Sequence, residues 1–91
     1  MEKIKLTGSD KQYLVSIGHV ESDFIQIEQA IGYITYTING KRISRKKAIE
    51  KLGRNAWLSG VARSAFHWSG VRITDDGTEI GFDASRFFRR N

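Results

Sequence analysis

The chain contains no cysteine and no proline among its 91 residues. Without cysteine it can form neither a disulfide framework nor a thiolate metal site. Without proline its turns must depend on glycine, asparagine and aspartate. The nine glycines are spread along the chain, and no segment has the composition of a linker, a repeat or a low-complexity tract. We therefore expect a single compact domain over residues 1–91.

Long apolar runs are also missing. Residues 1–6 lack the apolar run of a secretory signal peptide, and no stretch approaches the roughly 20 apolar residues that a transmembrane helix requires. These absences predict a cytoplasmic protein with no membrane partner. A hydrophobic content of 40% is too high for a disordered chain, so we expect a folded core.

Groups that carry catalysis are few. The chain has only two histidines, His19 and His67, and it has no phosphate-binding glycine loop and no nucleophile elbow. Asp75, Asp76 and Glu79 offer oxygen ligands, but their spacing matches no recognised metal loop, and capping or solvation of a turn is the favoured interpretation. We expect a protein that is not an enzyme, with no catalytic residues, no metal and no other cofactor.

Positive charge is concentrated in the middle of the chain. Residues 41–72 hold nine Lys or Arg residues and one acid, Glu50, for a net charge of +8, whereas residues 1–40 and 73–91 carry −2 and −1. Such segregated charge creates a local positive potential. It indicates a polyanionic partner, either nucleic acid or a protein that handles nucleic acid.

The first third of the chain is open to more than one interpretation. Alternating apolar residues predict a short strand over 3–7 and a second strand over 13–17. A helix that starts at Ser9, with Gln12 completing a capping box, is the alternative to the second strand. Residues 22–31 predict a short helix, with a strand as its alternative. Their signals are the candidate N-cap Ser22 and the C-terminal stop Gly32.

The remainder of the chain has clearer capping and turn signals. We expect a strand over 33–38, a turn at Asn39-Gly40, and a helix over 45–52 between Ser44 as N-cap and Gly53 as stop. A second helix over 55–68, a hairpin of 71–74 with 79–82, and a basic-aromatic tail over 85–90 complete the pattern. The predicted fold class is α+β: a small antiparallel sheet with a central pair of helices packed on one face.

The basic segment supplies the first candidate site. If its side chains contact phosphates, counterion release makes the affinity fall steeply with salt. A solvated lysine-rich helix face is the alternative. A sequence-reading helix-turn-helix fits poorly, because Ser59 and Ala62 stand where buried aliphatic residues normally hold a recognition helix. The candidate nucleic-acid-binding residues are Lys41, Arg42, Arg45, Lys46, Lys47, Lys51, Arg54 and Arg72.

The second predicted helix supplies another candidate. Ser59, Arg63 and His67 recur every four residues, beside Gly60. These four residues form a candidate partner-binding face. The alternative is that Gly60 and its small neighbour Ser64 let the helix lie close to the sheet.

Aromatic residues alternate with arginines near the end of the chain, which is also a pattern for stacking on nucleic-acid bases. For Phe66 and Trp68 we expect burial, because a domain of this size needs large side chains to fill its core. For Phe87 and Phe88 burial and exposure stay equally open.

The run from Tyr36 to Ser44, the segments 48–54 and 58–60, and the run from Arg63 to Trp68 resemble small accessory proteins of phages, plasmids and conjugative elements of Gram-positive bacteria. The resemblance covers about residues 33–70, with a weaker echo over 80–85. It implies one of two roles. One is binding of the element's nucleic acid. The other is inhibition of a host defence nuclease by protein–protein contacts, as anti-CRISPR proteins do.

Overall fold

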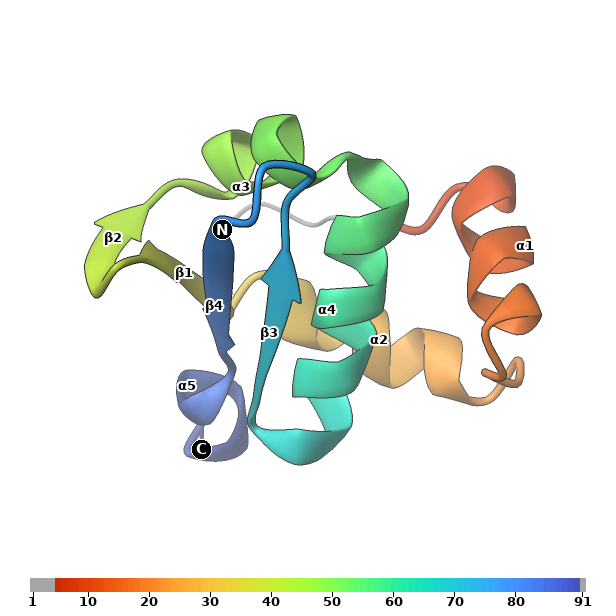
Figure 1. Cartoon of the computed structure of the whole chain (residues 1–91). Helices are drawn as coiled ribbons and strands as arrows, with labels where there is room; N and C mark the ends of the chain where they lie inside the picture. The colour runs from red at the N-terminus through yellow and green to blue at the C-terminus, as the bar shows by residue number, and fades with distance from the viewer. Residues whose placement is uncertain (1–4, 91) are drawn as a thin grey trace.

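The computed structural model describes residues 5–90 and confirms the α+β class (Figure 1). A four-stranded antiparallel sheet is packed with helices on one face, and α4 is the central helix. In chain order the elements are α1 (Gly8–Ser16), α2 (Asp23–Ile31), β1 (Thr35–Ile38), β2 (Lys41–Ile43), α3 (Arg45–Leu52), α4 (Arg54–His67), β3 (Ser69–Ile73), β4 (Glu79–Asp83) and α5 (Ser85–Phe88).

The strand order is β2-β1-β4-β3, so two hairpins are joined through the central pair β1 and β4. The first hairpin turns at Asn39 and Gly40, whose φ angles of +52° and +80° match the type I′ turn that an Asn-Gly pair predicts. Tyr36 lies opposite Phe82, and both are buried on the side that the helices cover.

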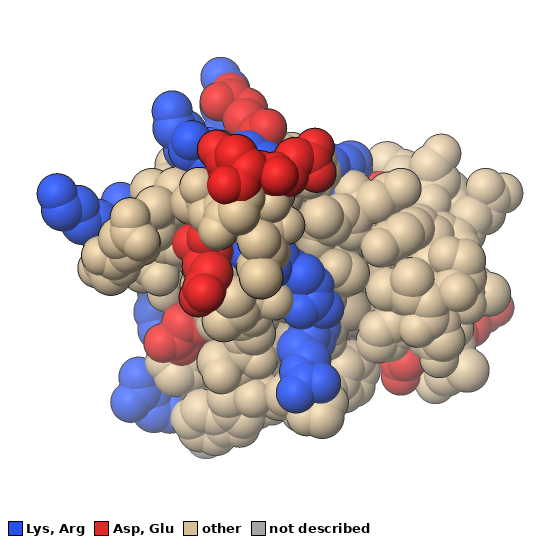
Figure 2. Space-filling model, in the orientation of Figure 1, with Lys and Arg blue, Asp and Glu red and all other residues tan. Residues whose placement is uncertain are grey.

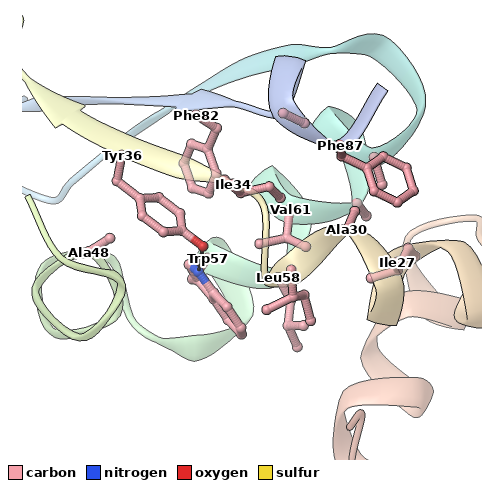
Figure 3. Packing of buried hydrophobic residues seen from close by; sticks show 14 of the residues in the cluster. Ile27, Ala30, Ile34, Tyr36, Ala48, Trp57, Leu58, Val61, Phe82 and Phe87 are labelled. Carbon is pink, nitrogen blue, oxygen red and sulfur yellow. Dashed lines mark hydrogen bonds between the residues drawn. The ribbon is translucent and has the colours of Figure 1, made fainter. Parts of the chain in front are cut away.

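The helix α4 lies against this covered side of the sheet. A Cβ atom at Gly60 would lie 2.4 Å from the ring of Phe82, so only glycine permits the observed approach. The Phe82 ring in turn packs edge-on to Tyr36 (Figure 3). Trp57 is buried beside the sheet and donates a hydrogen bond of 3.0 Å from Nε1 to the Tyr36 hydroxyl. Burial raises the pKa of Tyr36 to about 12, so this phenol stays protonated at neutral pH.

The predicted strand over 13–17 is wrong, because these residues belong to α1 or follow it directly. Thr7 accepts a hydrogen bond from the Asp10 backbone N–H, and the Asp10 carboxylate accepts one from the Thr7 N–H. This capping box begins the helix two residues before the alternative start at Ser9. Only Leu14 is an apolar buried residue of α1. Val15 and Ile17 are exposed, so the alternation that predicted a strand is not a burial pattern.

The strand predicted over 3–7 is not found where it can be checked. Residues 3 and 4 lie outside the described residues, and residues 5–7 lie in no strand. For residues 22–31 the helix prediction is confirmed by α2. Ser22 occupies the N-cap position, but its side chain makes no capping hydrogen bond there.

The strand, turn, helices and hairpin predicted over 33–82 are confirmed, with ends shifted by one or two residues. The strand β2 was not predicted, and the predicted tail over 85–90 contains the short helix α5. Ser44 caps α3 through a 3.0 Å bond from the Lys47 N–H to its Oγ, and Ala48 is buried as expected. Gly53, with φ of +86°, separates α3 from α4. That left-handed conformation suits glycine and lets a new helix begin in another direction at Arg54.

The burial prediction for Phe66 and Trp68 is wrong. Phe66 is 38% exposed and Trp68 is 48% exposed. Trp68 ends α4 with a positive φ of 71°, which turns its side chain away from the core, and its indole stacks on Phe88 at 4.9 Å. Phe87 fills the core in their place, whereas Phe88 is half-buried.

Candidate functional site

Five of the eight candidate nucleic-acid-binding residues lie on consecutive segments, the strand β2 and the first turn of α3. We call this set the β2–α3 surface; it consists of Lys41, Arg42, Arg45, Lys46 and Lys47. All are exposed except Arg45, which is half-buried. Figure 2 shows Lys and Arg side chains gathered over β2 and α3, at the upper left of the view. The strand β2 is also an edge of the sheet, and no further strand of residues 5–90 lies on its outer side.

The start of α3 is electrostatically unusual. Its first turn contains three basic residues and no acid. The unpaired N–H groups of a helix N-terminus carry partial positive charge, so cations are normally disfavoured and anions favoured there. Phosphate oxygens would be attracted both by these side chains and by the helix end. The arrangement therefore costs helix stability and favours an anionic partner.

Lys51, in the last turn of α3, has a different environment. It lines a shallow depression together with Asp75, Asp76 and two threonines of the β3–β4 turn. Asp76 accepts hydrogen bonds from Thr74 Oγ1, from Thr78 Oγ1 at 2.8 Å and from the Thr78 N–H at 3.1 Å. These bonds lower its pKa to about 2, with Thr74 making the largest contribution. Because these acids offset the charge of Lys51, we leave it out of the β2–α3 surface. The capping role expected for this turn is confirmed for Asp76.

The Arg54 guanidinium forms an ion pair with Asp10. Its Nε and Nη2 donate to the two carboxylate oxygens of Asp10, each at 2.9 Å, and the Asp10 side chain is only 3% exposed. The bidentate bond lowers the pKa of Asp10 and raises that of Arg54. The guanidinium joins α1 to the start of α4, and because its charge is offset by Asp10 we leave Arg54 out of the β2–α3 surface, so its contact with nucleic acid stays a prediction.

Arg72 also lies apart from the β2–α3 surface. It stands on β3 at the opposite edge of the sheet, next to α4. Its Nε donates to the Ser59 Oγ at 2.7 Å, its Nη2 to the Ser59 carbonyl at 3.2 Å, and its Nη1 to the Val71 carbonyl at 2.7 Å. Figure 2 shows this second basic area as a stripe in the centre of the view, along β3 and α4.

The candidate partner-binding set on α4 is only partly available to a partner. Gly60 is buried against Phe82, so its predicted contact with a partner is corrected in favour of the close-packing alternative. Ser64 is buried as well and bonds back to the Gly60 carbonyl at 2.9 Å. Ser59 is half-buried, whereas Arg63 and His67 are exposed.

Ser59, Arg63 and His67 line one wall of a cleft of about 590 Å³, together with Phe66 and Arg72. The other lining residues include Ile17 and His19 of the connection between α1 and α2, and Asp23 at the start of α2. The sequence interpretation did not identify His19 and Asp23 as site residues. The four-residue spacing of His19 and Asp23 could have indicated a contact between their side chains. The strand expected over 13–17 gave no reason to place His19 beside the helix that carries Arg63 and His67.

The helix-turn-helix alternative does not fit the arrangement of α3 and α4. The second helix of such a motif must be able to enter a groove of DNA. Here α4 contacts α1, α2, α3, β3 and β4, and seven of its fourteen residues are buried. This helix is the centre of the fold and is not available to a major groove.

No protein-family model matches the chain, and neither a curated sequence nor a solved structure shows significant similarity to it. The resemblance to accessory proteins of mobile elements therefore stays a prediction. Among residues 5–90, no helix has the length and apolar character needed to cross a membrane.

Proposed function

We propose that the protein is a non-catalytic binding module that contacts nucleic-acid phosphates through the β2–α3 surface. The observation that carries the proposal is the position of five Lys and Arg residues on one hairpin strand and the adjoining helix start. None of the ion pairs found among residues 5–90 involves Lys41, Arg42, Lys46 or Lys47. Their charges are thus available to a polyanion.

The arrangement favours contacts to the backbone over base recognition. Three of the five residues lie in the first turn of α3, where the helix end adds its own attraction for phosphate. The other two lie on a three-residue strand, and the central helix α4 packs against α1, α2, α3 and the sheet. Phosphate contacts fix position but carry no sequence information. We therefore expect weak dependence on sequence and strong dependence on salt.

A charge-reversal pair tests the proposal. In Lys46→Glu/Lys47→Glu, both substituted side chains are exposed, so the fold should be retained. The matched control is Lys5→Glu/Arg86→Glu, which changes the net charge equally at exposed positions outside β2 and α3. We expect the first variant to lose binding to a fluorescent oligonucleotide at about 50 mM salt, and the control to keep most of it. Equal affinity of both variants would rule out the β2–α3 surface.

Docking on a host defence nuclease is the alternative function. Its expected face is reduced by the burial of Gly60, but Arg63 and His67 stay exposed beside Phe66 and Trp68. Exposed aromatic residues next to arginine are typical of energetically important protein contacts. Capture of a purified nuclease by the wild-type protein, and its loss in Arg63→Glu, would support this function instead.

A further inference from the structure

We propose that the cleft between the α1–α2 connection and α4–β3 binds a nucleoside phosphate, with the phosphate held by Arg63 and Arg72 and the base against Phe66. The proposal goes beyond the phosphate contacts of the β2–α3 surface and shares no residue with it. The cleft volume of about 590 Å³ lies within the range of small-molecule sites in proteins.

Arg72 provides a cationic group that is already oriented. Three of its N–H groups are used in the bonds to Ser59 and Val71, and all three acceptors are neutral oxygens. Ser59 is itself fixed by a bond of 2.8 Å from its Oγ to the Ala56 carbonyl. Since a guanidinium carries five N–H donors, two are left for a ligand. A positive charge held by neutral groups keeps its attraction for an anion.

Arg63 adds a second cation to the same wall. Its Cγ would lie 3.1 Å from a Cβ atom on Gly70, so its aliphatic part rests over the glycine of β3. Within residues 5–90 its guanidinium has neither a hydrogen-bond partner nor an ion-pair partner. Two arginines on one wall offer the paired N–H donors that suit phosphate oxygens.

Asp23, the acidic residue that lines the cleft, already accepts hydrogen bonds. Asp23 interacts with the His19 Nδ1 at 3.0 Å and accepts from the Val20 N–H at 3.3 Å. Asp23 comes from the α2 side of the cleft, whereas the two arginines come from α4 and β3, and its Oδ2 is already hydrogen-bonded. The second histidine, His67, lies on the arginine-bearing helix and adds a further N–H donor.

The aromatic part of the cleft suits a flat ring. Phe66 is 38% exposed, and its ring is stacked on the His19 imidazole at 6.2 Å with an interplanar angle of 25°. Exposed aromatic faces next to arginine are the elements that hold nucleobases in single-strand binding sites. N–H donors for phosphate oxygens and an exposed aromatic face together point to a nucleotide rather than to inorganic phosphate alone.

The test is an NMR titration of ¹⁵N-labelled protein with adenosine 5′-monophosphate. We expect saturable shifts of the amides of Gly18, His19, Arg63 and His67, weaker binding of inorganic phosphate, and no saturable binding of adenosine. Arg63→Gln should weaken AMP binding about tenfold or more, since it removes charge-assisted hydrogen bonds. Arg86→Gln, which makes the same charge change at an exposed position outside both the cleft and the β2–α3 surface, should leave AMP binding unchanged.

Two further titrations complete the test. Phe66→Leu should weaken AMP but not inorganic phosphate, which separates loss of the aromatic face from loss of the fold. A 5′-phosphorylated dinucleotide that shifts the same amides more tightly than AMP would identify the ligand as a strand end, and weaker binding would identify a free nucleotide. The proposal is overturned if about 10 mM AMP shifts none of these amides, since binding would then be weaker than millimolar. It is equally overturned if Arg63→Gln and Arg86→Gln bind AMP alike.

Discussion

The substitution Lys47→Glu should stabilise the protein and weaken its binding to nucleic acid. Lys47 is exposed and donates its backbone N–H to the Ser44 cap at 3.0 Å, so it occupies the third position of α3. A glutamate at this position completes a capping box with Ser44. It also faces Lys51 one turn later, so a like-charged pair becomes an attractive one.

The expected magnitude follows from these two changes. An acid in place of a base at a helix N-terminus contributes about 0.3–1 kcal/mol per charge. Reversing the pair with Lys51 contributes about 0.2–0.5 kcal/mol from lost repulsion and a similar amount from gained attraction. The same substitution turns the i,i+3 pair with Glu50 from attractive to repulsive at a similar cost, so the two pair effects cancel and the interaction with the helix end remains. Because the site is exposed and screened by salt, we take about 1 kcal/mol as the total. For a domain of this size, that raises the Tm by about 4–8 °C.

The assay is thermal unfolding followed by circular dichroism, with Lys46→Glu as the matched control. That variant gains the same interaction with the helix end, but it places a glutamate one turn before Glu50, and the new repulsion offsets the gain. Both variants should weaken oligonucleotide binding, since each removes one phosphate contact. A Tm for Lys47→Glu that is no higher than that of Lys46→Glu would refute the reasoning about the start of α3.

Two further predictions concern the packing that positions the surfaces. Gly60→Ala should destabilise the protein by about 1–3 kcal/mol although alanine favours helix, because its methyl group meets the Phe82 ring. Adding Phe82→Leu to the Gly60→Ala variant should recover part of the lost stability. An unchanged chemical-denaturation midpoint for Gly60→Ala would contradict the close approach of α4 to Phe82. Asp10→Asn should cost about 1–3 kcal/mol at neutral pH by breaking the bond to Arg54. The pKa of Asp10 is lowered below 3.8 on folding, so its stabilisation is complete above that pH and is lost as the pH falls through the folded value. The Tm difference between wild type and Asp10→Asn should therefore shrink in acid, and a constant difference would exclude the ion pair as its source.

The elements that sequence reasoning predicted correctly are those with local signals. Ser44, Gly53 and the Asn39-Gly40 turn each determine a boundary through bonds or φ angles within a few residues. The strand expected over 13–17 failed because an alternation of three apolar residues is a weaker signal than the capping box that begins with Thr7.

The features that failed or were missed depend on distant parts of the chain. The ion pair of Arg54 is formed with Asp10, which lies 44 residues earlier in the sequence, so no local pattern predicts it. The cleft exists because the connection after α1 lies beside α4, and no local pattern around His19 indicates that neighbour. The exposure of Trp68 follows from its left-handed backbone conformation, which its residue type does not predict.

The most direct test of the central claim is the salt dependence of oligonucleotide binding by the wild-type protein. Fluorescence anisotropy with single- and double-stranded DNA and RNA, from about 50 to 200 mM salt, reports the number of phosphates neutralised. Five contacts on the β2–α3 surface predict a log–log slope of about −4 to −5 on duplex DNA, with similar affinities for unrelated sequences. The account is contradicted if no binding occurs at the lowest salt, or if the affinity does not change with salt.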